Sequence, residues 1–391
     1  MFDNTLMPPT SSIVPGFPAG DNGSSFANYI AHIQTIICER RCIPKHLDNA
    51  KTANVLEANS PFECLPDFLP PTGTKYQYGA LLIHGLLDSP FSLKDIALRL
   101  KTNNVLSRAL LLPGHGTVPQ DLLQVSYQDW IQTVRYGIDV MQRDVEKIFL
   151  IGYSTGAALS IYQALQPENR KQIAGLILLA PAIRIKAPVD IVIGWNYLKK
   201  WLSKKNLKWL YREKEIDYAK YHSITFNAVN QVAQLTNVIR DLNKKRPLDI
   251  PILMVMSNDD ETISSHSALN YFCSLNEPNS KLLLYTTSNR THTDKRIETR
   301  KSSYPELHIK NFSHVTVPFA ADNKHYGQHG DYSYASHLNT TQYLYGAYNR
   351  LEEKIYNQLY QFKLIKHKHR ELTYNPDFDY MIKQIIDFII S

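Results

Sequence analysis

A serine lies between two glycines in the stretch GYSTG, and this arrangement raises the question of nucleophilic chemistry. The pentapeptide runs from Gly152 to Gly156, follows the apolar run EKIFLI and precedes the alanine-rich run AALSIYQAL. A G-x-S-x-G sequence between a strand and a helix places its serine on a sharp turn that exposes the hydroxyl. We therefore predict that Ser154 is a nucleophile. A surface turn that merely needs small residues is the alternative interpretation.

A serine hydroxyl is a poor nucleophile at neutral pH, so it needs a base and a group that orients the base. Functional groups of a parallel sheet collect beyond the carboxyl ends of its strands. The stretch PILMVMSNDDETI places two carboxylates directly after an apolar run. We predict that Asp260 orients the base, and prefer it to Asp259 because it lies deeper in the turn. These acids could instead cap the following helix, which is expected to begin near Ser264.

The predicted base is His314, which ends a short extended run in ELHIKNFSHVTVPF. Other histidines could take this role, and the competitors are His308, His325 and His329. The gap between Asp260 and His314 contains the polar stretch SNRTHTDKRIETRKSSYPEL, which indicates an insertion at 288–310. Long surface insertions are tolerable because loop closure costs little additional entropy.

A developing oxyanion also needs hydrogen-bond donors. The stretch LLIHGLLDSP ends an apolar run with a His-Gly turn, which brings backbone amides near the predicted nucleophile. We predict that the amides of Leu86 and Thr155 are these donors. His84 is expected to hold the turn by hydrogen bonds and not to act as a base.

Apolar runs alternate with helical patterns around these residues. The runs YGALLIHGLL, RALLLPGHG, EKIFLIGYS and AGLILLAPAI are separated by SLKDIALRLKT, SYQDWIQTVRYGIDVMQRD and TGAALSIYQAL. Strands that are apolar throughout and alternate with helices predict a mostly parallel, doubly wound α/β sheet that is covered on both faces. The pattern covers residues 77–183 and resumes at 249–260 and 280–287.

Composition divides the chain into four predicted regions. These are a disordered arm at 1–25, an N-terminal helical extension at 26–76, a catalytic domain at 77–183 and 249–391, and a helical cap or lid at 184–248. The cap is rich in Trp, Tyr and Lys and is too long for an ordinary loop. YMIKQIIDFII is expected to form the closing helix, and no role is predicted for the extension at 317–375.

Residues 195–214 are expected to form a basic amphipathic helix. Its apolar face would carry Trp195, Leu198, Leu202 and Trp209, and its lysines are Lys199, Lys200, Lys204, Lys205 and Lys208. A helix of this kind suits peripheral contact with an anionic membrane. The alternative is a lid that packs on the catalytic domain and leaves its lysines in solvent.

Bulk composition excludes several other classes of protein. Hydrophobic residues make up 43% of the 391-residue chain and charged residues 20%, as in an ordinary globular protein. The net charge of +7 is modest, and without an arginine-rich arm it predicts no nucleic-acid partner. The four cysteines have no metal-ligand spacing. We see neither a secretory signal nor a membrane-spanning run of about 18 apolar residues, and expect a cytoplasmic location.

The stretches LLIHGLLDSPFSL, LLPGHG, GYSTG, SNDDETI and FSHVT occur in this order. Together they resemble the carboxylesterase and monoacylglycerol-lipase-like branch of the α/β-hydrolases, in which serine, acid and histidine follow one another along the chain. The resemblance implies an α/β-hydrolase fold with a helical cap insertion. It also implies that Ser154, Asp260 and His314 are the catalytic residues and that Leu86 and Thr155 form the oxyanion hole.

These observations predict a serine hydrolase that cleaves a small-molecule acyl ester or lipid through an acyl-enzyme, without a metal ion or an organic cofactor. An acyltransferase, a thioesterase or an amidase would use the same residues. A non-catalytic binding or membrane-docking module on a hydrolase scaffold is a further alternative. A haloalkane dehalogenase is disfavoured because its chemistry needs a carboxylate where Ser154 stands.

Overall fold

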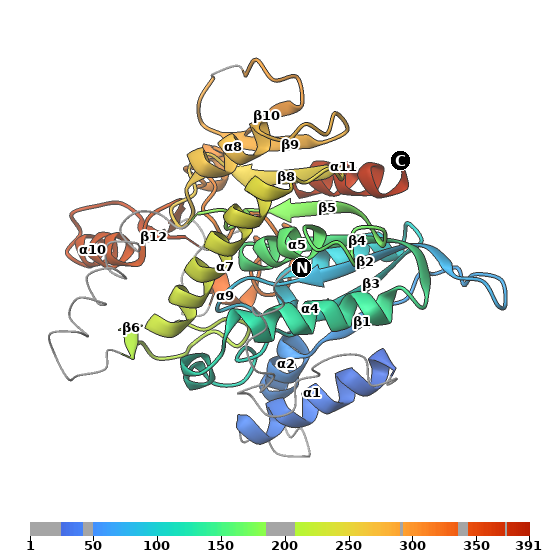
Figure 1. Cartoon of the computed structure of the whole chain (residues 1–391). Coiled ribbons are helices and arrows are strands. Elements are labelled where there is room, and N and C mark those ends of the chain that lie inside the picture. Colours follow the sequence, from blue (N-terminus) through green and yellow to red (C-terminus); the bar gives the residue numbers. More distant parts are fainter. Residues whose placement is uncertain (1–24, 42–49, 185–207, 290–291, 335–342, 372–373) are drawn as a thin grey trace, which may run out of the picture.

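The computed structural model describes residues 25–41, 50–184, 208–289, 292–334, 343–371 and 374–391. Its central feature is an eight-stranded sheet with the order β1-β3-β2-β4-β5-β8-β9-β10 (Figure 1). The strands are β1 (Phe62–Cys64), β2 (Tyr76–Ile83), β3 (Val105–Leu110), β4 (Val145–Tyr153), β5 (Ile173–Leu179), β8 (Ile252–Ser257), β9 (Lys281–Thr286) and β10 (Ile297–Lys301). Neighbouring strands are parallel except for β1 and β3. The prediction of a mostly parallel sheet is confirmed.

The central strands are buried on both faces, which explains their continuous apolar sequences. In β2, Leu81 and Ile83 belong to the hydrophobic core on one face of the sheet, whereas Ala80 and Leu82 belong to the core on the other. Successive side chains of a strand point to opposite faces. A strand with a core on each side must therefore be apolar at every position.

Helices supply the other half of each core (Figure 1). On one face lie α1 (Phe26–Arg40), α4 (Tyr127–Met141), α5 (Thr155–Ala164), α7 (Phe226–Lys245) and α8 (Ser265–Cys273). On the other lie α3 (Lys94–Lys101) and α11 (Phe378–Ile390), the predicted closing helix. The chain also forms α2 (Ala50–Asn59) and the 3₁₀ helices Pro90–Leu93, Pro119–Leu123 and Pro305–Leu307. Within the described ranges, no helix is both long and apolar enough to cross a lipid bilayer.

Both edge strands come from outside the alternating pattern. β1 lies in the predicted helical extension at 26–76 and pairs antiparallel with β3. β10 lies within the predicted insertion at 288–310 and continues the parallel sheet beside β9, so residues 297–301 belong to the sheet. Its charged residues obscure the strand in the sequence, yet they are paired: Arg300 forms an ion pair with Asp377 at 2.7 Å. Charged side chains suit an edge strand because one side of it lacks a partner strand.

The range 184–248 contains a short hairpin followed by α7. The hairpin pairs β6 (Trp209–Tyr211) antiparallel with β7 (Ile224–Thr225). The prediction of a helix over 195–214 is therefore wrong for residues 209–211, which form a strand. Aromatic residues favour a strand once a partner strand is available, and that partner is distant in sequence. Residues 185–207 lie outside the described residues, so the predicted membrane contact of this segment stays a prediction.

Residues 317–375 contain α9 (Asp331–Tyr334), β11 (Tyr343–Tyr345), α10 (Arg350–Gln361) and β12 (Lys368–Arg370). β11 and β12 form a two-stranded parallel sheet. His325 and Tyr326 fasten this extension to the segment before β7. The His325 Nε2 lies 3.0 Å from Asp217 Oδ1, and the Tyr326 hydroxyl donates to Asp217 Oδ2 at 2.6 Å. Since Asp217 is buried, these bonds hold two distant parts of the chain together.

Candidate active site

Ser154 lies on a strained turn between β4 and α5. Its backbone has φ 54° and ψ −112°, a combination that residues with a side chain rarely adopt. Backbone hydrogen bonds hold this conformation. The Ser154 amide donates to Leu179 O at 2.9 Å, and the Ser154 carbonyl accepts from the amides of Ala157 and Ala182 at 3.1 Å each. The serine is thus fixed at the carboxyl end of β4, as the sequence predicts.

The glycines on either side are required by close backbone contact. A Cβ atom at Gly152 would lie 2.4 Å from the carbonyl oxygen of Gly156, and one at Gly156 would lie 1.9 Å from the carbonyl oxygen of Ile83. Both distances are far below van der Waals contact. The G-x-S-x-G pattern therefore reflects the packing of α5 against β2 as well as the turn itself.

A chain of hydrogen bonds leads from Ser154 through His314 to Asp260. The His314 Nε2 lies 2.9 Å from Ser154 Oγ, and His314 Nδ1 lies 2.6 Å from Asp260 Oδ2. A carboxylate oxygen only accepts, so Nδ1 carries a proton and Nε2 is the acceptor that faces the serine hydroxyl. The structure brings the three predicted residues together, although they are far apart in the sequence.

The two adjacent aspartates have different partners. Asp260 is fully buried, and its Oδ1 accepts the amides of Thr262 and Ile263 at 2.8 and 2.9 Å. Asp259 instead accepts the Ser302 hydroxyl at 3.3 Å, beside the end of β10. The structure therefore places Asp260, and not Asp259, against the imidazole.

The competing histidines lie in other surroundings. His325 contacts Asp217 and Asp331, and its ring lies 4.0 Å from that of Tyr218. The His308 ring lies 5.2 Å from the ring of His367, and His329 is exposed. None of the hydrogen bonds described for these three rings involves Ser154.

Glu261 holds the backbone of His314, a contact that sequence reasoning missed. Its two carboxylate oxygens lie 3.0 and 3.3 Å from the His314 amide, which donates to them. Two further contacts fix the same loop. The Ser257 hydroxyl donates to Phe312 O at 2.8 Å, and the Tyr153 ring stacks on the His314 ring at 5.4 Å. The only sequence signal for Glu261 is its place directly after the predicted acid.

Neighbouring charges set the protonation of the imidazole. Burial lowers the pKa of His314, but the charge of Asp260, its hydrogen bond and the charge of Glu261 outweigh burial and raise this pKa above the ordinary 6.5. Burial and the charge of Asp260 together raise the pKa of Glu261 to about 7. A neutral imidazole, which can accept a proton, therefore predominates only above the raised pKa of His314.

The turn predicted to supply an oxyanion donor lies directly against the serine. A Cβ atom at Gly85 would lie 3.1 Å from Ser154 Cβ, and Leu86 follows this glycine. Thr155 is the first residue of α5, so its amide has no acceptor within the helix. The assignment of the Leu86 and Thr155 amides as oxyanion donors stays a prediction.

His84 holds this turn, in agreement with the sequence analysis. Its Nδ1–H donates to Gly85 O at 2.8 Å, and its Nε2 accepts the Leu112 amide at 3.0 Å. Burial lowers the pKa of His84 to about 3, so its ring is neutral. A neutral ring with both nitrogens engaged ties the loops after β2 and β3 together.

Residues before β7 complete the support of the same turn. The Lys220 ammonium lies 3.0 Å from Asp88 Oδ2, and the Tyr221 amide donates to Leu87 O at 2.8 Å. Lys220 also lies over the Tyr153 ring, 5.6 Å from its centroid. The predicted cap range therefore contacts the loop that carries Leu86.

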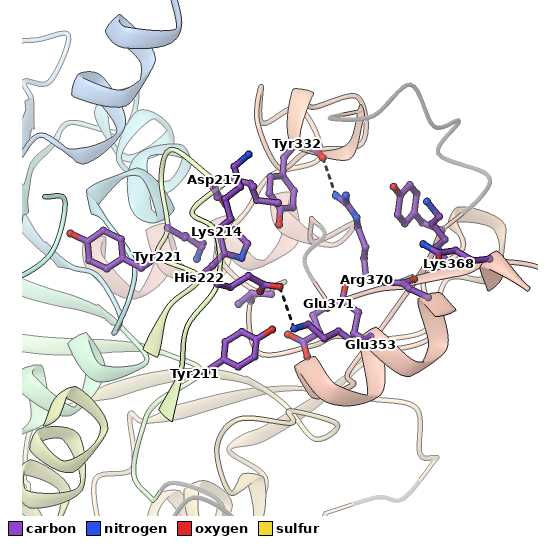
Figure 2. A pocket seen from close by; sticks show the side chains of 18 residues that line it. Tyr211, Lys214, Asp217, Tyr221, His222, Tyr332, Glu353, Lys368, Arg370 and Glu371 are labelled. Carbon is purple, nitrogen blue, oxygen red and sulfur yellow. Dashed lines mark hydrogen bonds and ion pairs between the residues drawn. The ribbon is translucent and has the colours of Figure 1, made fainter. Parts of the chain in front are cut away.

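A cavity of about 520 Å³ borders this region, between residues 211–222 and the C-terminal extension. Its wall includes Lys220 and also Val315, which follows His314 in the chain. Figure 2 shows that tyrosines and charged side chains from both segments surround it. Among the described residues there is no group of three or more His, Cys, Asp or Glu side chains arranged to hold a metal ion.

Comparison with known proteins identifies the family. A family model of α/β-hydrolases, described as serine aminopeptidase S33, matches residues 79–289, which is more than half of the chain. The chain belongs to this α/β-hydrolase family. The predicted resemblance to α/β-hydrolases is thus confirmed. His314 lies beyond the matched residues.

Two curated relatives of this α/β-hydrolase carry lipase or esterase names. A thermostable monoacylglycerol lipase from Bacillus sp. (strain H-257) is 24% identical over 192 residues, which are 49% of this chain and 73% of the relative. A putative esterase/lipase 3 from Mycoplasma pneumoniae is 25% identical over an alignment of 190 residues, with coverage of 42% of this chain and 62% of the relative.

Solved structures resemble the α/β-hydrolase chain at lower identity. One belongs to a study of the metagenome-derived lipolytic enzymes LipS and LipT and has 18% identity, a TM-score of 0.48 and coverage of 62% of this chain and 91% of its own. Another is a monoacylglycerol lipase from Paleococcus ferrophilus with 15% identity, a TM-score of 0.46 and coverage of 58% of this chain and 88% of its own.

Replacement of Gly156 by alanine is expected to lower the free energy of unfolding by about 3 kcal/mol or more, because the new methyl group collides with the β2 backbone. Urea denaturation measures this loss. The control is Gly73→Ala, where the added methyl meets nothing within 4 Å and only the positive φ of 83° is unfavourable. Its expected cost is about 1 kcal/mol. A Gly156→Ala protein as stable as the Gly73→Ala protein would contradict the packing argument.

Replacement of Glu261 by glutamine is expected to lower the pKa of His314, because a negative charge beside the imidazole is removed. The glutamine oxygen can still accept the His314 amide, so the loop should remain in place. Nuclear magnetic resonance titration of the imidazole measures the pKa. Asp259→Asn, in the same turn, serves as control and should leave it unchanged. An unaltered pKa in the Glu261→Gln protein would count against this electrostatic role.

Proposed function

We propose that the protein is a serine hydrolase that cleaves carboxylic esters through an acyl-enzyme on Ser154. The observation that carries the proposal is the pair of distances around His314, 2.9 Å to Ser154 Oγ and 2.6 Å to Asp260 Oδ2. This chain of contacts joins a nucleophile, a base and the group that orients the base. The strained turn at Ser154 and its place before the N-terminus of α5 support the same proposal.

In the first half of the reaction, Ser154 Oγ attacks the acyl carbonyl carbon while His314 Nε2 takes the hydroxyl proton. The carbonyl oxygen becomes an oxyanion, which the amides of Leu86 and Thr155 stabilise. Asp260 accepts the hydrogen bond from His314 Nδ1–H throughout, stays ionised and stabilises the imidazolium that forms. The intermediate then collapses, the bond to the ester oxygen breaks, and the imidazolium returns its proton to the leaving alcohol.

In the second half, water replaces the alcohol. His314 Nε2 takes a proton from this water, whose oxygen attacks the acyl carbon bound to Ser154. Collapse of the second tetrahedral intermediate breaks the bond to Ser154 Oγ, which regains a proton from the imidazolium, and the carboxylic acid leaves. These steps need no metal ion or organic cofactor, because the side chains of the site carry the proton in both directions.

The relatives favour an ester over an amide as the bond that is cleaved. The family description names an aminopeptidase, whereas the curated relatives are named monoacylglycerol lipase and putative esterase/lipase. Esters are also the easier substrate for this chemistry, since an alkoxide leaves more readily than the much more basic anion of an amine. We therefore propose esters of small molecules or lipids as the substrate class.

Treatment with a fluorophosphonate probe is expected to label Ser154, because a serine activated by a neighbouring imidazole attacks phosphorus as it attacks an acyl carbon. Mass spectrometry locates the label. The same protein should hydrolyse p-nitrophenyl butyrate, whereas an aminoacyl nitroanilide should be a much poorer substrate. Ser154→Ala should lose both labelling and ester hydrolysis. Labelling that persists in the Ser154→Ala protein, or faster hydrolysis of the nitroanilide, would contradict the proposal.

Asp260→Asn is expected to lower kcat/KM by about 10³-fold or more, because the amide NH₂ can donate to His314 Nδ1 and so favours the wrong imidazole tautomer. The rising limb of kcat/KM with pH should also move to lower pH, since Asp260 raises the pKa of His314. Asp259→Asn is the matched control, because Asp259 contacts Ser302 instead. It should change kcat/KM by less than about threefold. Equal losses in both proteins would show that the choice of acid is wrong.

A further inference from the structure

Five large apolar side chains are exposed on α10 and just beyond its end. They are Leu351, Ile355, Leu359, Phe362 and Leu364, with exposed fractions of 67%, 51%, 36%, 75% and 69%. We call this set the apolar ridge. Its first four members are separated by four, four and three residues, which places them on one side of the helix. Isolated exposed leucines are common, but a continuous row of this kind marks an interaction surface.

The other side of α10 attaches the helix to the protein. The Asn357 side-chain oxygen accepts the His369 amide of β12 at 2.9 Å. The Tyr356 ring stacks on the Tyr348 ring, with centroids 5.9 Å apart. Figure 1 shows α10 at the periphery of the molecule, beyond β12. The apolar ridge therefore points away from the side that is packed.

The end of α10 places a lysine between the two most exposed residues of the apolar ridge. The Lys363 amide donates to Tyr360 O and the Leu364 amide to Leu359 O, both at 2.9 Å, a pattern that ends many helices. Lys363 has φ 58°, a left-handed conformation in which glycine is usual and a side chain is unfavourable. The chain thus carries a cation, flanked by Phe362 and Leu364, where glycine would be less strained.

The charge around the C-terminal part of the apolar ridge has one sign, whereas Glu352 and Glu353 follow Leu351 at its other end. From Lys354 to Arg370 the sequence contains no aspartate or glutamate, whereas it contains four lysines and one arginine. Lys363 and Lys366 are exposed beside Phe362 and Leu364. Apolar side chains flanked by cations are typical of helices that lie in the interface of an anionic bilayer.

We propose that the apolar ridge, with Lys363 and Lys366, binds the surface of an anionic lipid bilayer. Phe362 and Leu364 would enter the boundary between headgroups and acyl chains, and the lysines would contact lipid phosphates. This surface is distinct from the segment 195–214 and lies outside the residues that match the family model. A role of this surface in bringing lipid esters from the bilayer to Ser154 rests on the proposed function. Binding of the protein to the bilayer does not depend on hydrolysis.

Flotation of the full-length protein with vesicles tests the proposal. One set contains phosphatidylcholine alone, and the other contains phosphatidylcholine and phosphatidylglycerol at three to one. The protein should bind the anionic vesicles more tightly, with an affinity that falls as salt is raised. Phe362→Ser with Leu364→Ser should weaken this binding at least about tenfold, because two apolar side chains lose their burial. Lys363→Asn with Lys366→Gln should weaken it about fivefold for each lysine that contacts the lipid.

A matched control is available in the loop between β1 and β2. Phe68 and Leu69 are exposed to 74% and 73%, as much as Phe362 and Leu364. Their loop lies on the opposite side of the molecule from α10 in Figure 1. Phe68→Ser with Leu69→Ser should leave vesicle binding unchanged. A loss as large as that of the Phe362 and Leu364 variant would mean that exposed apolar surface in general, and not the apolar ridge, is responsible.

Two further results would overturn the proposal. One is equal affinity for neutral and anionic vesicles. The other is a wild-type dimer in sedimentation velocity that the Phe362 and Leu364 substitutions convert to a monomer, since a second copy would then cover the apolar ridge. Hydrolysis of dissolved p-nitrophenyl butyrate separates this question from the proposed function. The α10 variants should retain it, and a wild-type protein without it would refute the esterase while the vesicle result still stands.

Discussion

The backbone at Ser154 is held in a conformation that a serine does not favour, and the rest of the site is arranged around it. A non-glycine residue at this positive φ costs about 1–3 kcal/mol, which the surrounding packing must offset. Bonds to β5 on one side and α5 on the other supply part of this compensation. The absence of side chains at Gly152 and Gly156 allows α5 to pack against β2 at a distance that any Cβ atom would prevent. The hydroxyl is therefore presented by the rigid centre of the sheet.

The imidazole reaches this hydroxyl from a loop with no regular structure. Its position is determined by contacts from several strand ends: Asp260 and Glu261 after β8, Ser257 at the end of β8 and Tyr153 at the end of β4. Glu261 has two effects, because it accepts the loop amide and also adds negative charge beside the ring. The turn that carries Glu261 therefore affects both the position of His314 and its protonation.

The segment before β7 and the C-terminal extension, of which only the extension lies beyond the family match, surround this centre and give it its particular environment. Lys220 and Tyr221 contact the loop that carries Leu86, while Asp217 joins their segment to His325 and Tyr326 of the extension. The Ser313 hydroxyl, next to His314, donates to Glu371 O at 2.5 Å. The extension is therefore in contact with the histidine loop on its inner side. Its outermost helix, α10, presents the apolar ridge on the other side.

Local patterns in the sequence determined the central strands, the flanking helices and the candidate nucleophile. A strand buried on both faces must be apolar at each position, and a tight turn before a helix requires small residues, so both leave a signature within about ten residues. Asp260 and His314 were also predictable, because each follows an apolar or extended run. The tertiary structure places Asp260 against the imidazole, in agreement with the sequence analysis, and it alone decided that Glu261 holds the histidine loop. It also decided that the charged stretch at β10 and the aromatic stretch at Trp209–Tyr211 are strands. In each of these cases the deciding partner is distant along the chain, and a hydrogen bond or ion pair to a distant residue leaves no periodic pattern in the sequence.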